Sequence, residues 1–259
     1  MNWFEAIILG LIQGLTEFLP VSSSGHLEIA KSLFGINPET SFYFTIAVHG
    51  ATVLSTLVVF WKEIVKLAEG IFKFRMNEET SYIIKLVVSM VPVGVTGILL
   101  KDPVEKLFNG NIVFIGLMLL ITAALLCIAH FVKKRNRSIG YLDALIIGIA
   151  QAVAVIPGIS RSGATISTGI IIGNKKDEIA KFSFLMVLIP VIGANLLELL
   201  SSEIISNNIG TEIILIGFIS AFISGYIACR WMISLVKRSK LIWFSVYCAI
   251  VGILSVFLG

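Results

Sequence analysis

Two stretches of the chain decide its fold: Glu5–Leu27, EAIILGLIQGLTEFLPVSSSGHL, and Asp143–Thr165, DALIIGIAQAVAVIPGISRSGAT. They align at one offset of 138 positions, which pairs Gln13 with Gln151, Ser22 with Ser160, Ser24 with Ser162 and Gly25 with Gly163. Each copy is apolar, is then broken by Pro, and becomes rich in Ser and Gly. In lipid such a broken segment must be buried or line a cavity, because its backbone amides cannot stay unpaired in hydrocarbon. Paired broken segments in two halves of a chain point to a site between them.

Composition places the whole chain in the membrane. Hydrophobic residues make up 57% of it, charged residues only 14%, and the mean hydropathy is +0.97. Soluble domains carry about 25% charged residues, so an ordinary soluble domain is excluded. The N-terminus lacks the basic region and cleavage site of a signal peptide. Cys127, Cys229 and Cys248 lie inside apolar runs and are expected to be packing residues.

Six apolar runs approach the roughly 20 residues that a membrane span needs: 42–61, 81–100, 112–132, 179–200, 212–236 and 241–258. The two broken segments, about 4–34 and 141–173, are instead predicted to be re-entrant helix hairpins. The expected fold is an all-α polytopic membrane protein, a single membrane domain over 1–259. It consists of two inverted repeats, 1–137 and 139–259, each a re-entrant helix hairpin plus three transmembrane helices. Three spans per repeat is an odd number, so the second repeat must be inverted.

The distribution of basic residues predicts the orientation. With the N-terminus outside, segments 62–80, 133–141, 174–181 and 237–240 lie inside, and they hold 14 of the 20 Lys and Arg. The outside segments hold only Lys31, Lys101 and Lys106. The positive-inside rule therefore predicts both termini outside. An arrangement in which all eight apolar segments cross the membrane also keeps both termini on one side. The Pro, Ser and Gly residues that interrupt the two broken segments favour re-entrant hairpins more decisively than the charges do.

The first broken segment carries most of the reactive groups. Gln13 and Glu17 are four residues apart and share a helical face. A carboxylate inside an apolar segment is costly and by default functional, although Glu17 could merely cap or pair. The Ser22–Ser24 turn opens a helix whose free amides suit an anion. His26, just beyond this turn, can act as acid, base or nucleophile, whereas a lone histidine is more often structural.

The second broken segment contributes a cation. Arg161 lies among Ser160, Ser162 and Thr165, and its planar fork suits phosphate. The alternative is an arginine that snorkels or pairs with a buried acid.

The repeat offset divides the chemistry between the two copies. Glu17 aligns with Val155, His26 with Ala164, and Arg161 with Ser23. The acid, the imidazole and the serines thus come from one copy and the guanidinium from the other. If the Ser- and Gly-rich turns of the two segments, the hairpin tips, meet, they form one composite anion site.

The motifs QGLTEFLPVSSSGH (13–26) and PGISRSGATI (157–166) resemble the two signatures of the BacA-type undecaprenyl-diphosphate phosphatases. Phe182-Ser-Phe-Leu and Val91-Pro-Val also resemble family features. The resemblance implies an enzyme of the bacterial plasma membrane that removes the terminal phosphate of undecaprenyl diphosphate. That reaction recycles the lipid carrier for peptidoglycan synthesis and confers bacitracin resistance. The resemblance also implies six spans with two inverted re-entrant hairpins, and a divalent cation, Mg²⁺ or Ca²⁺.

Carried over by motif, the catalytic residues are Glu17, Ser23, His26 and Arg161. The residues expected to bind the substrate phosphates are Ser22, Ser24, Gly25, Ser160, Ser162, Gly163 and Thr165. The metal ligands would be Glu17 and Gln13, where Gln13 stands in place of a frequent second glutamate.

The reaction is expected at an outward-facing cavity. Ser23 is the favoured attacking group with His26 taking its proton, and His26 as the attacking group is left open. Glu17 is expected to act as base or metal ligand. The expected partners are undecaprenyl diphosphate and membrane lipid, without nucleic acid, and a homodimer is left open. The competing hypothesis is a polyprenyl-phosphate flippase or transporter, since inverted repeats with broken helices are transporter architecture.

Overall fold

The fold is helical throughout the part of the chain that the computed structural model describes, residues 1–36, 41–100, 107, 111–132, 135–201, 209–238 and 240–258. Within these ranges eleven helices follow one another. They are α1 (Trp3–Phe18), α2 (Ser23–Leu33), α3 (Phe42–Val59), α4 (Trp61–Ile71), α5 (Glu78–Leu99), α7 (Ile112–Phe131), α8 (Tyr141–Val153), α9 (Arg161–Ile171), α10 (Lys176–Ser201), α11 (Thr211–Lys237) and α12 (Ile242–Leu258). The extended pairing in the same ranges is a single parallel bridge between Arg137 and Asn174. The all-α prediction is confirmed.

Five of the described helices are long and apolar enough to cross a membrane: α3, α5, α7, α10 and α11. They match five of the six predicted spans, and α12, with 17 residues, matches the sixth in position. Their outer faces are apolar, as on α5, where Val87, Val91 and Val95 are about half exposed. Exposed apolar surface on this scale indicates a lipid environment. The protein is a multi-pass membrane protein.

Both broken segments fold as helix–turn–helix units, α1–α2 and α8–α9, and α1 begins one residue before the predicted 4–34. The first helix of each unit, α1 or α8, begins with the same capping hydrogen bond, in which an acidic side chain accepts from the backbone N–H three residues earlier. Glu5 accepts from Asn2 at 2.8 Å, and Asp143 accepts from Gly140 at 2.9 Å. Such capping satisfies amides that would otherwise lack partners at a helix start. The repeat found in the sequence is therefore a repeat of local structure.

Each broken helix packs against a long helix of the other half of the chain, α1 on α11 and α8 on α5. Glycine allows this approach. A Cβ on Gly14 would lie 2.0 Å from Ser224 Oγ and 2.5 Å from the Ala221 carbonyl oxygen. A Cβ on Gly148 would lie 2.3 Å from the Ser89 carbonyl oxygen. The backbones of the paired helices are thus nearly in contact, as is common between helices in membranes.

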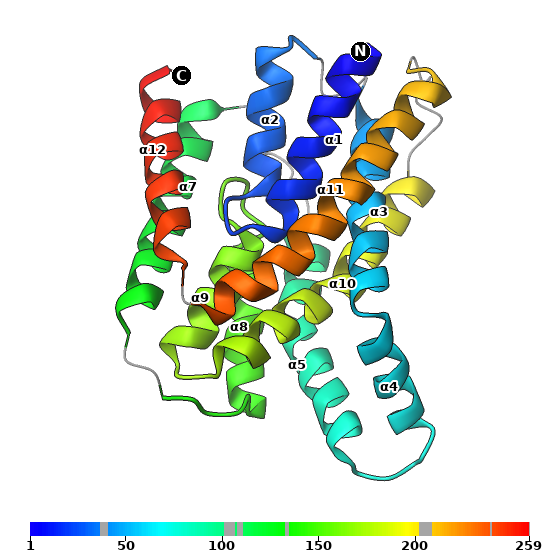
Figure 1. Cartoon of the computed structure of the whole chain (residues 1–259), viewed down its shortest axis with the longest axis vertical. Coiled ribbons are helices and arrows are strands. Elements are labelled where there is room, and N and C mark those ends of the chain that lie inside the picture. Colours follow the sequence, from blue (N-terminus) through cyan, green and yellow to red (C-terminus); the bar gives the residue numbers. More distant parts are fainter. Residues whose placement is uncertain are drawn as a thin grey trace.

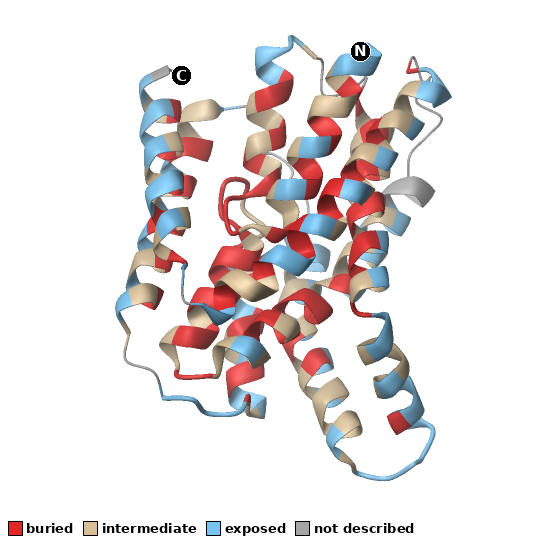
Figure 2. Ribbon diagram, viewed as in Figure 1, coloured by how far each residue is buried: buried red, intermediate tan, exposed pale blue. Residues whose placement is uncertain are grey.

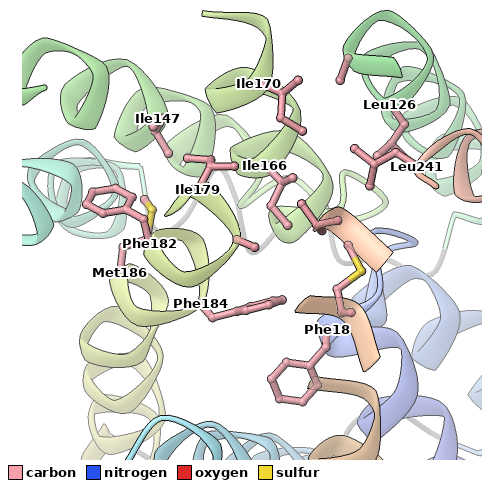
Figure 3. Close-up of a cluster of buried hydrophobic side chains, with 14 of the residues drawn as sticks. Phe18, Leu126, Ile147, Ile166, Ile170, Ile179, Phe182, Phe184, Met186 and Leu241 are labelled. Carbon is pink, nitrogen blue, oxygen red and sulfur yellow. The ribbon is translucent and has the colours of Figure 1, made fainter. Parts of the chain in front are cut away.

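The core lies where the two hairpins come together. In Figure 2 the buried residues concentrate on the helices at the middle of the molecule. There Phe18 of α1 meets Phe184 of α10 edge to face, with ring centroids 5.7 Å apart (Figure 3). Phe60 packs against the same ring at 6.1 Å. One buried cluster therefore contains residues from both halves and holds the end of α1 in place.

The start of the chain and the end of α12 lie at one end of the molecule, and the α4–α5 turn projects from the other (Figure 1). The sequence analysis expected 62–80 to be a connecting segment, but α4 occupies much of it. With 11 residues, α4 is too short to span and gives no span signal. It packs along α5, where Lys66 pairs with Glu79 at 3.4 Å.

Candidate active site

Three side chains from three helix ends meet between the hairpin tips. Glu17 lies in the last turn of α1, Ser23 is the first residue of α2, and Arg161 is the first residue of α9. One Glu17 carboxylate oxygen accepts from Arg161 Nη2 at 2.9 Å. The other accepts from Ser23 Oγ at 2.6 Å and from Gln13 Nε2 at 3.0 Å. Residues 144 positions apart in the sequence thus form one hydrogen-bonded group.

The Glu17–Arg161 ion pair also fits the structural alternative, in which each residue serves to neutralise the other. Their side chains are 12% and 31% exposed respectively. A simple ion pair does not require the additional short contact between Ser23 and Glu17. A carboxylate that accepts a serine proton donor at 2.6 Å is the arrangement of a nucleophile beside its base. The Ser23 contact is thus a feature that a reactive site requires and a simple ion pair does not.

A cavity opens beside this group between α1, α3, α9 and α10. Its polar lining consists of Glu17, Arg161, Ser162, Thr52, Thr56 and Ser183. Its apolar lining consists of Phe18, Val53, Phe184, Val187, Leu188 and Val191. A pocket with one polar and one apolar part suits a ligand that has a charged head and a hydrocarbon chain.

His26 lies on α2 but is turned away from Ser23. Its Nδ1 lies 2.8 Å from the carbonyl oxygen of Ser22, and its Nε2 lies 2.8 Å from Tyr247 Oη. The His26 and Tyr247 rings are stacked at 5.6 Å. The sequence analysis expected His26 to take the proton of Ser23, but the structure gives that hydrogen bond to Glu17.

The residues expected to bind phosphate fall into two groups. Ser22 and Ser160 cap α2 and α9, and each accepts the amide three residues later, from Gly25 at 3.3 Å and from Gly163 at 3.1 Å. Ser22 takes a positive φ of 69°, a strained conformation for a non-glycine residue. Strain of this kind concentrates at functional sites, which favours a functional role for the turn between α1 and α2.

The remaining members differ in access to the cavity. Ser162 lines it and also donates to the Leu19 carbonyl oxygen at 3.2 Å, which joins the two tips. Ser24 is half-buried beside Ser22, with 3.5 Å between the two hydroxyls. Thr165 is buried and hydrogen-bonded to Ser183 at 2.5 Å, outside the cavity lining. Of the expected phosphate ligands, Ser162 alone lines this cavity.

The carboxylate and the amide expected to bind a cation are neighbours on α1. Gln13 is fully buried, and its Oε1 lacks a hydrogen-bond partner among the described residues. A buried oxygen without a partner beside a carboxylate fits a hard cation. Among the described residues, no three His, Cys, Asp or Glu side chains form a metal-binding cluster. A cation here would take most of its ligands from phosphate oxygens and water, as Mg²⁺ commonly does.

Comparison with known proteins gives the family of the chain. The sequence model of the bacitracin resistance protein BacA matches residues 6–254. The chain belongs to the BacA family. An undecaprenyl-diphosphatase of Bacteroides fragilis is 54% identical over 260 residues, which cover 99% of this chain and 98% of that protein. The undecaprenyl-diphosphatase of Parabacteroides distasonis is 52% identical over 260 residues, covering 99% and 98%. That of Methanosphaera stadtmanae is 38% identical over 281 residues, covering 100% and 99%.

Several residues that line or support the site of this BacA-family chain escaped the sequence analysis. Thr52 and Thr56 of α3 and Ser183 of α10 line the cavity, and Tyr247 of α12 contacts His26. The two threonines are four apart and share a face of an otherwise apolar span, which is a signal that could have marked them. Ser183 lies within the Phe-Ser-Phe-Leu stretch already singled out. Tyr247 has no comparable local signal.

Proposed function

We propose that this BacA-family chain is an undecaprenyl-diphosphatase, a membrane enzyme that hydrolyses undecaprenyl diphosphate to undecaprenyl phosphate and inorganic phosphate. The activity recycles the lipid carrier for peptidoglycan synthesis and confers bacitracin resistance. The observation that carries the proposal is the Ser23–Glu17–Arg161 group, which joins a nucleophile, its base and an anion-binding guanidinium. The match to relatives of that name along nearly the whole chain supports it.

The cavity supports the choice of a lipid substrate. Its polar part holds Arg161 and Ser162, which suit the diphosphate, and its apolar part holds Val53, Val187 and Val191. The first isoprene units would lie against these valines, and the rest of the chain would extend into the bilayer. Arg161 donates one N–H to Glu17, and its fork has further donors for phosphate oxygens.

The first step is attack by Ser23 Oγ on the terminal phosphorus. A serine O–P bond forms, the P–O bond to the bridging oxygen breaks, and undecaprenyl phosphate leaves with that oxygen. The serine proton passes to the Glu17 oxygen that already accepts it. Arg161 and the first-turn amides of α2 neutralise the phosphate oxygens, the main catalytic contribution in phosphoryl transfer. In the second step, water attacks the phosphorus and the serine O–P bond breaks. The proton held by Glu17 returns to Ser23 Oγ, and the water oxygen with its protons leaves as part of inorganic phosphate.

Glu17 and Gln13 would hold the divalent cation, Mg²⁺ or Ca²⁺, together with substrate phosphate. When bound, the cation supplies positive charge to the phosphate oxygens. His26, three residues beyond Ser23 on α2, is assigned a proton-transfer role through Nε2, because the Tyr247 hydroxyl beside Nε2 can both donate and accept, whereas the carbonyl oxygen beside Nδ1 can only accept.

The proposed membrane arrangement has six spans, α3, α5, α7, α10, α11 and α12, with α1–α2 and α8–α9 as re-entrant hairpins. Two inverted repeats, 1–137 and 139–259, form the single membrane domain. The reciprocal packing of α1 on α11 and α8 on α5 supports the repeat, since these pairs exchange under the 138-residue offset. The Lys and Arg distribution supports a plasma-membrane orientation with both termini and the active site outside.

A polyprenyl-phosphate flippase would need the same cavity but no nucleophile. The comparisons give that alternative no support, since the relatives named above are diphosphatases. A homodimer stays a prediction.

The test is phosphate release from undecaprenyl diphosphate by purified protein in detergent, where transport cannot occur. The wild type should release phosphate in a cation-dependent way, and Ser23→Ala should be nearly inactive while it still unfolds as a folded protein on heating. Ser81→Ala, which also removes a hydroxyl with one side-chain hydrogen bond, is the matched control and should keep full activity. Full activity of Ser23→Ala would exclude the serine mechanism, and no release by wild type would exclude the function.

A further inference from the structure

Tyr247 is a residue of α12 with a specific contact to the active-site hairpin. We propose that Tyr247 is a positioning residue of the phosphatase reaction, which holds the His26 ring and its reactive nitrogen in place through one hydrogen bond and one stacking contact. The inference rests on the proposed function and deepens it. It assigns a role to a tyrosine that is 221 positions from its partner in the sequence.

The hydrogen bonds of His26 define which ring nitrogen can exchange a proton. Nδ1 lies 2.8 Å from the Ser22 carbonyl oxygen, which can only accept, so Nδ1 carries a hydrogen and donates it. In the neutral ring Nε2 is therefore the acceptor, and the Tyr247 hydroxyl 2.8 Å away donates to it. When His26 is protonated, Nε2–H donates and the same hydroxyl turns to accept. Tyr247 thus serves both protonation states without movement of heavy atoms.

Stacking restricts the remaining freedom of the imidazole. The two rings are nearly parallel, with an interplanar angle of 14° and centroids 5.6 Å apart. The Ser22 carbonyl oxygen holds one edge of the imidazole ring and the Tyr247 hydroxyl holds the opposite edge, so rotation of the ring would break both hydrogen bonds. Catalytic groups need orientation of this kind, because small misplacements cost large factors in rate.

Tyr247 can position His26 only if α12 is itself fixed relative to the hairpin, and several contacts do this. Cys248, the next residue, donates its thiol to the Pro20 carbonyl oxygen at 3.4 Å in the turn between α1 and α2. Ser245 donates to the Ala123 carbonyl oxygen of α7 at 2.7 Å. Gly252 lies directly against α7, since a Cβ there would lie 2.8 Å from the Gly116 carbonyl oxygen. Tyr247 is therefore held on a fixed helix.

The Tyr247→Phe variant tests the proposal, because it keeps the aromatic ring and removes only the hydroxyl. We expect kcat to fall by about 10- to 100-fold, the usual effect of removing an orienting partner of a site residue, with KM unchanged. Tyr226→Phe is the matched control. Its hydroxyl also has one side-chain partner, Arg230 at 3.0 Å, and its loss should leave kcat and KM at wild-type values.

A double variant separates positioning from simple packing. If Tyr247 acts through His26, Tyr247→Phe should have no further effect on kcat in a His26→Ala background. The same fold loss in that background would overturn the proposal, as would wild-type kcat in Tyr247→Phe. The melting temperature of each variant in detergent shows that the protein is folded.

A spectroscopic measurement on the wild type does not depend on activity. Nitrogen-15 NMR of histidine-labelled protein should show neutral His26 protonated at Nδ1, with Nε2 as the acceptor. His26→Ala identifies the signal. A neutral ring protonated at Nε2 would overturn the proposed arrangement. If phosphate release failed while this tautomer was found, the proposed function would be wrong and the His26–Tyr247 arrangement would stand.

Discussion

Replacing Glu17 with glutamine tests the centre of the site most directly. The Glu17 carboxylate accepts from three donors, Gln13, Ser23 and Arg161, whereas an amide of the same shape has only one oxygen. At least one donor therefore loses its acceptor, Arg161 loses its counter-charge, and Ser23 loses its base. Loss of a general base lowers rates by about 10²–10⁴, which corresponds to about 2.7–5.5 kcal/mol in the activation barrier.

The expected loss of stability in Glu17→Gln is much smaller. A hydrogen bond to a charged group contributes about 1.5–3 kcal/mol. Because the Arg161 side chain is 31% exposed, solvent takes up part of this loss, and we expect about 1–2 kcal/mol. The variant should therefore fold and fail in catalysis.

The assay is initial-rate phosphate release by purified protein in detergent, with thermal unfolding measured on the same samples. Glu28→Gln is the matched control. Glu28 lies on α2, has a side chain 17% exposed and pairs with Lys31 at 3.5 Å, but does not contact the reactive group. We expect it to lose stability and keep its rate. A rate of Glu17→Gln within tenfold of wild type, or an equal loss of rate in Glu28→Gln, would refute the reasoning.

Three further predictions concern the arginine, the helix contacts and the topology. Arg161→Lys keeps the charge but loses the planar fork, and kcat should fall by about 10²–10³ in the phosphate-release assay. The control Arg230→Lys, on α11 away from the site, should keep the wild-type rate. A normal rate in Arg161→Lys would mean that charge alone suffices. Gly14→Ala should lower the melting temperature in detergent, because the new methyl meets the Ala221 carbonyl oxygen at 2.5 Å and overpacking costs about 1–3 kcal/mol. Gly50→Ala, which meets nothing within 4 Å, should instead gain about 0.5–1 kcal/mol, and equal effects of the two substitutions would exclude close packing as the cause. For the topology, single cysteines are placed in a background without the three native cysteines. A cysteine at exposed Leu33 or Thr211 should react with a label added outside intact cells, whereas a cysteine at Asn136 should react only after the membrane is opened. Labelling of position 136 from outside would contradict the proposed orientation.

The sequence predicted the class of the protein and the boundaries of the hairpins because both depend on local physical chemistry. An apolar run of span length identifies a membrane helix wherever it lies, and Pro, Ser and Gly interrupt such a run wherever they occur. The helices α1–α2 and α8–α9 occupy 3–33 and 141–171, close to the predicted 4–34 and 141–173. The short helix α4 was missed, because its 11 residues form a helix mainly by packing along α5.

The sequence also marked Glu17 and Arg161 as unusual, since a charge inside an apolar segment is visible from composition alone. It could not decide which group faces Ser23. The five residues between Glu17 and Ser23 include a Pro-containing turn and the strained Ser22, and this local geometry turns the serine back onto the carboxylate. His26 is instead hydrogen-bonded to Tyr247, which lies on another helix 221 positions away.

What the sequence by itself determined is thus the long apolar helices, the two similar broken segments and the charged residues in them. What only the tertiary structure decided is the pairing of those residues with each other and with Thr52, Ser183 and Tyr247. The physical reason is the distance along the chain over which each kind of interaction acts. Helix formation and membrane insertion depend on residues within a few turns, whereas a hydrogen bond between distant helices depends on how close packing at Gly14, Gly148 and Gly252 brings their backbones together.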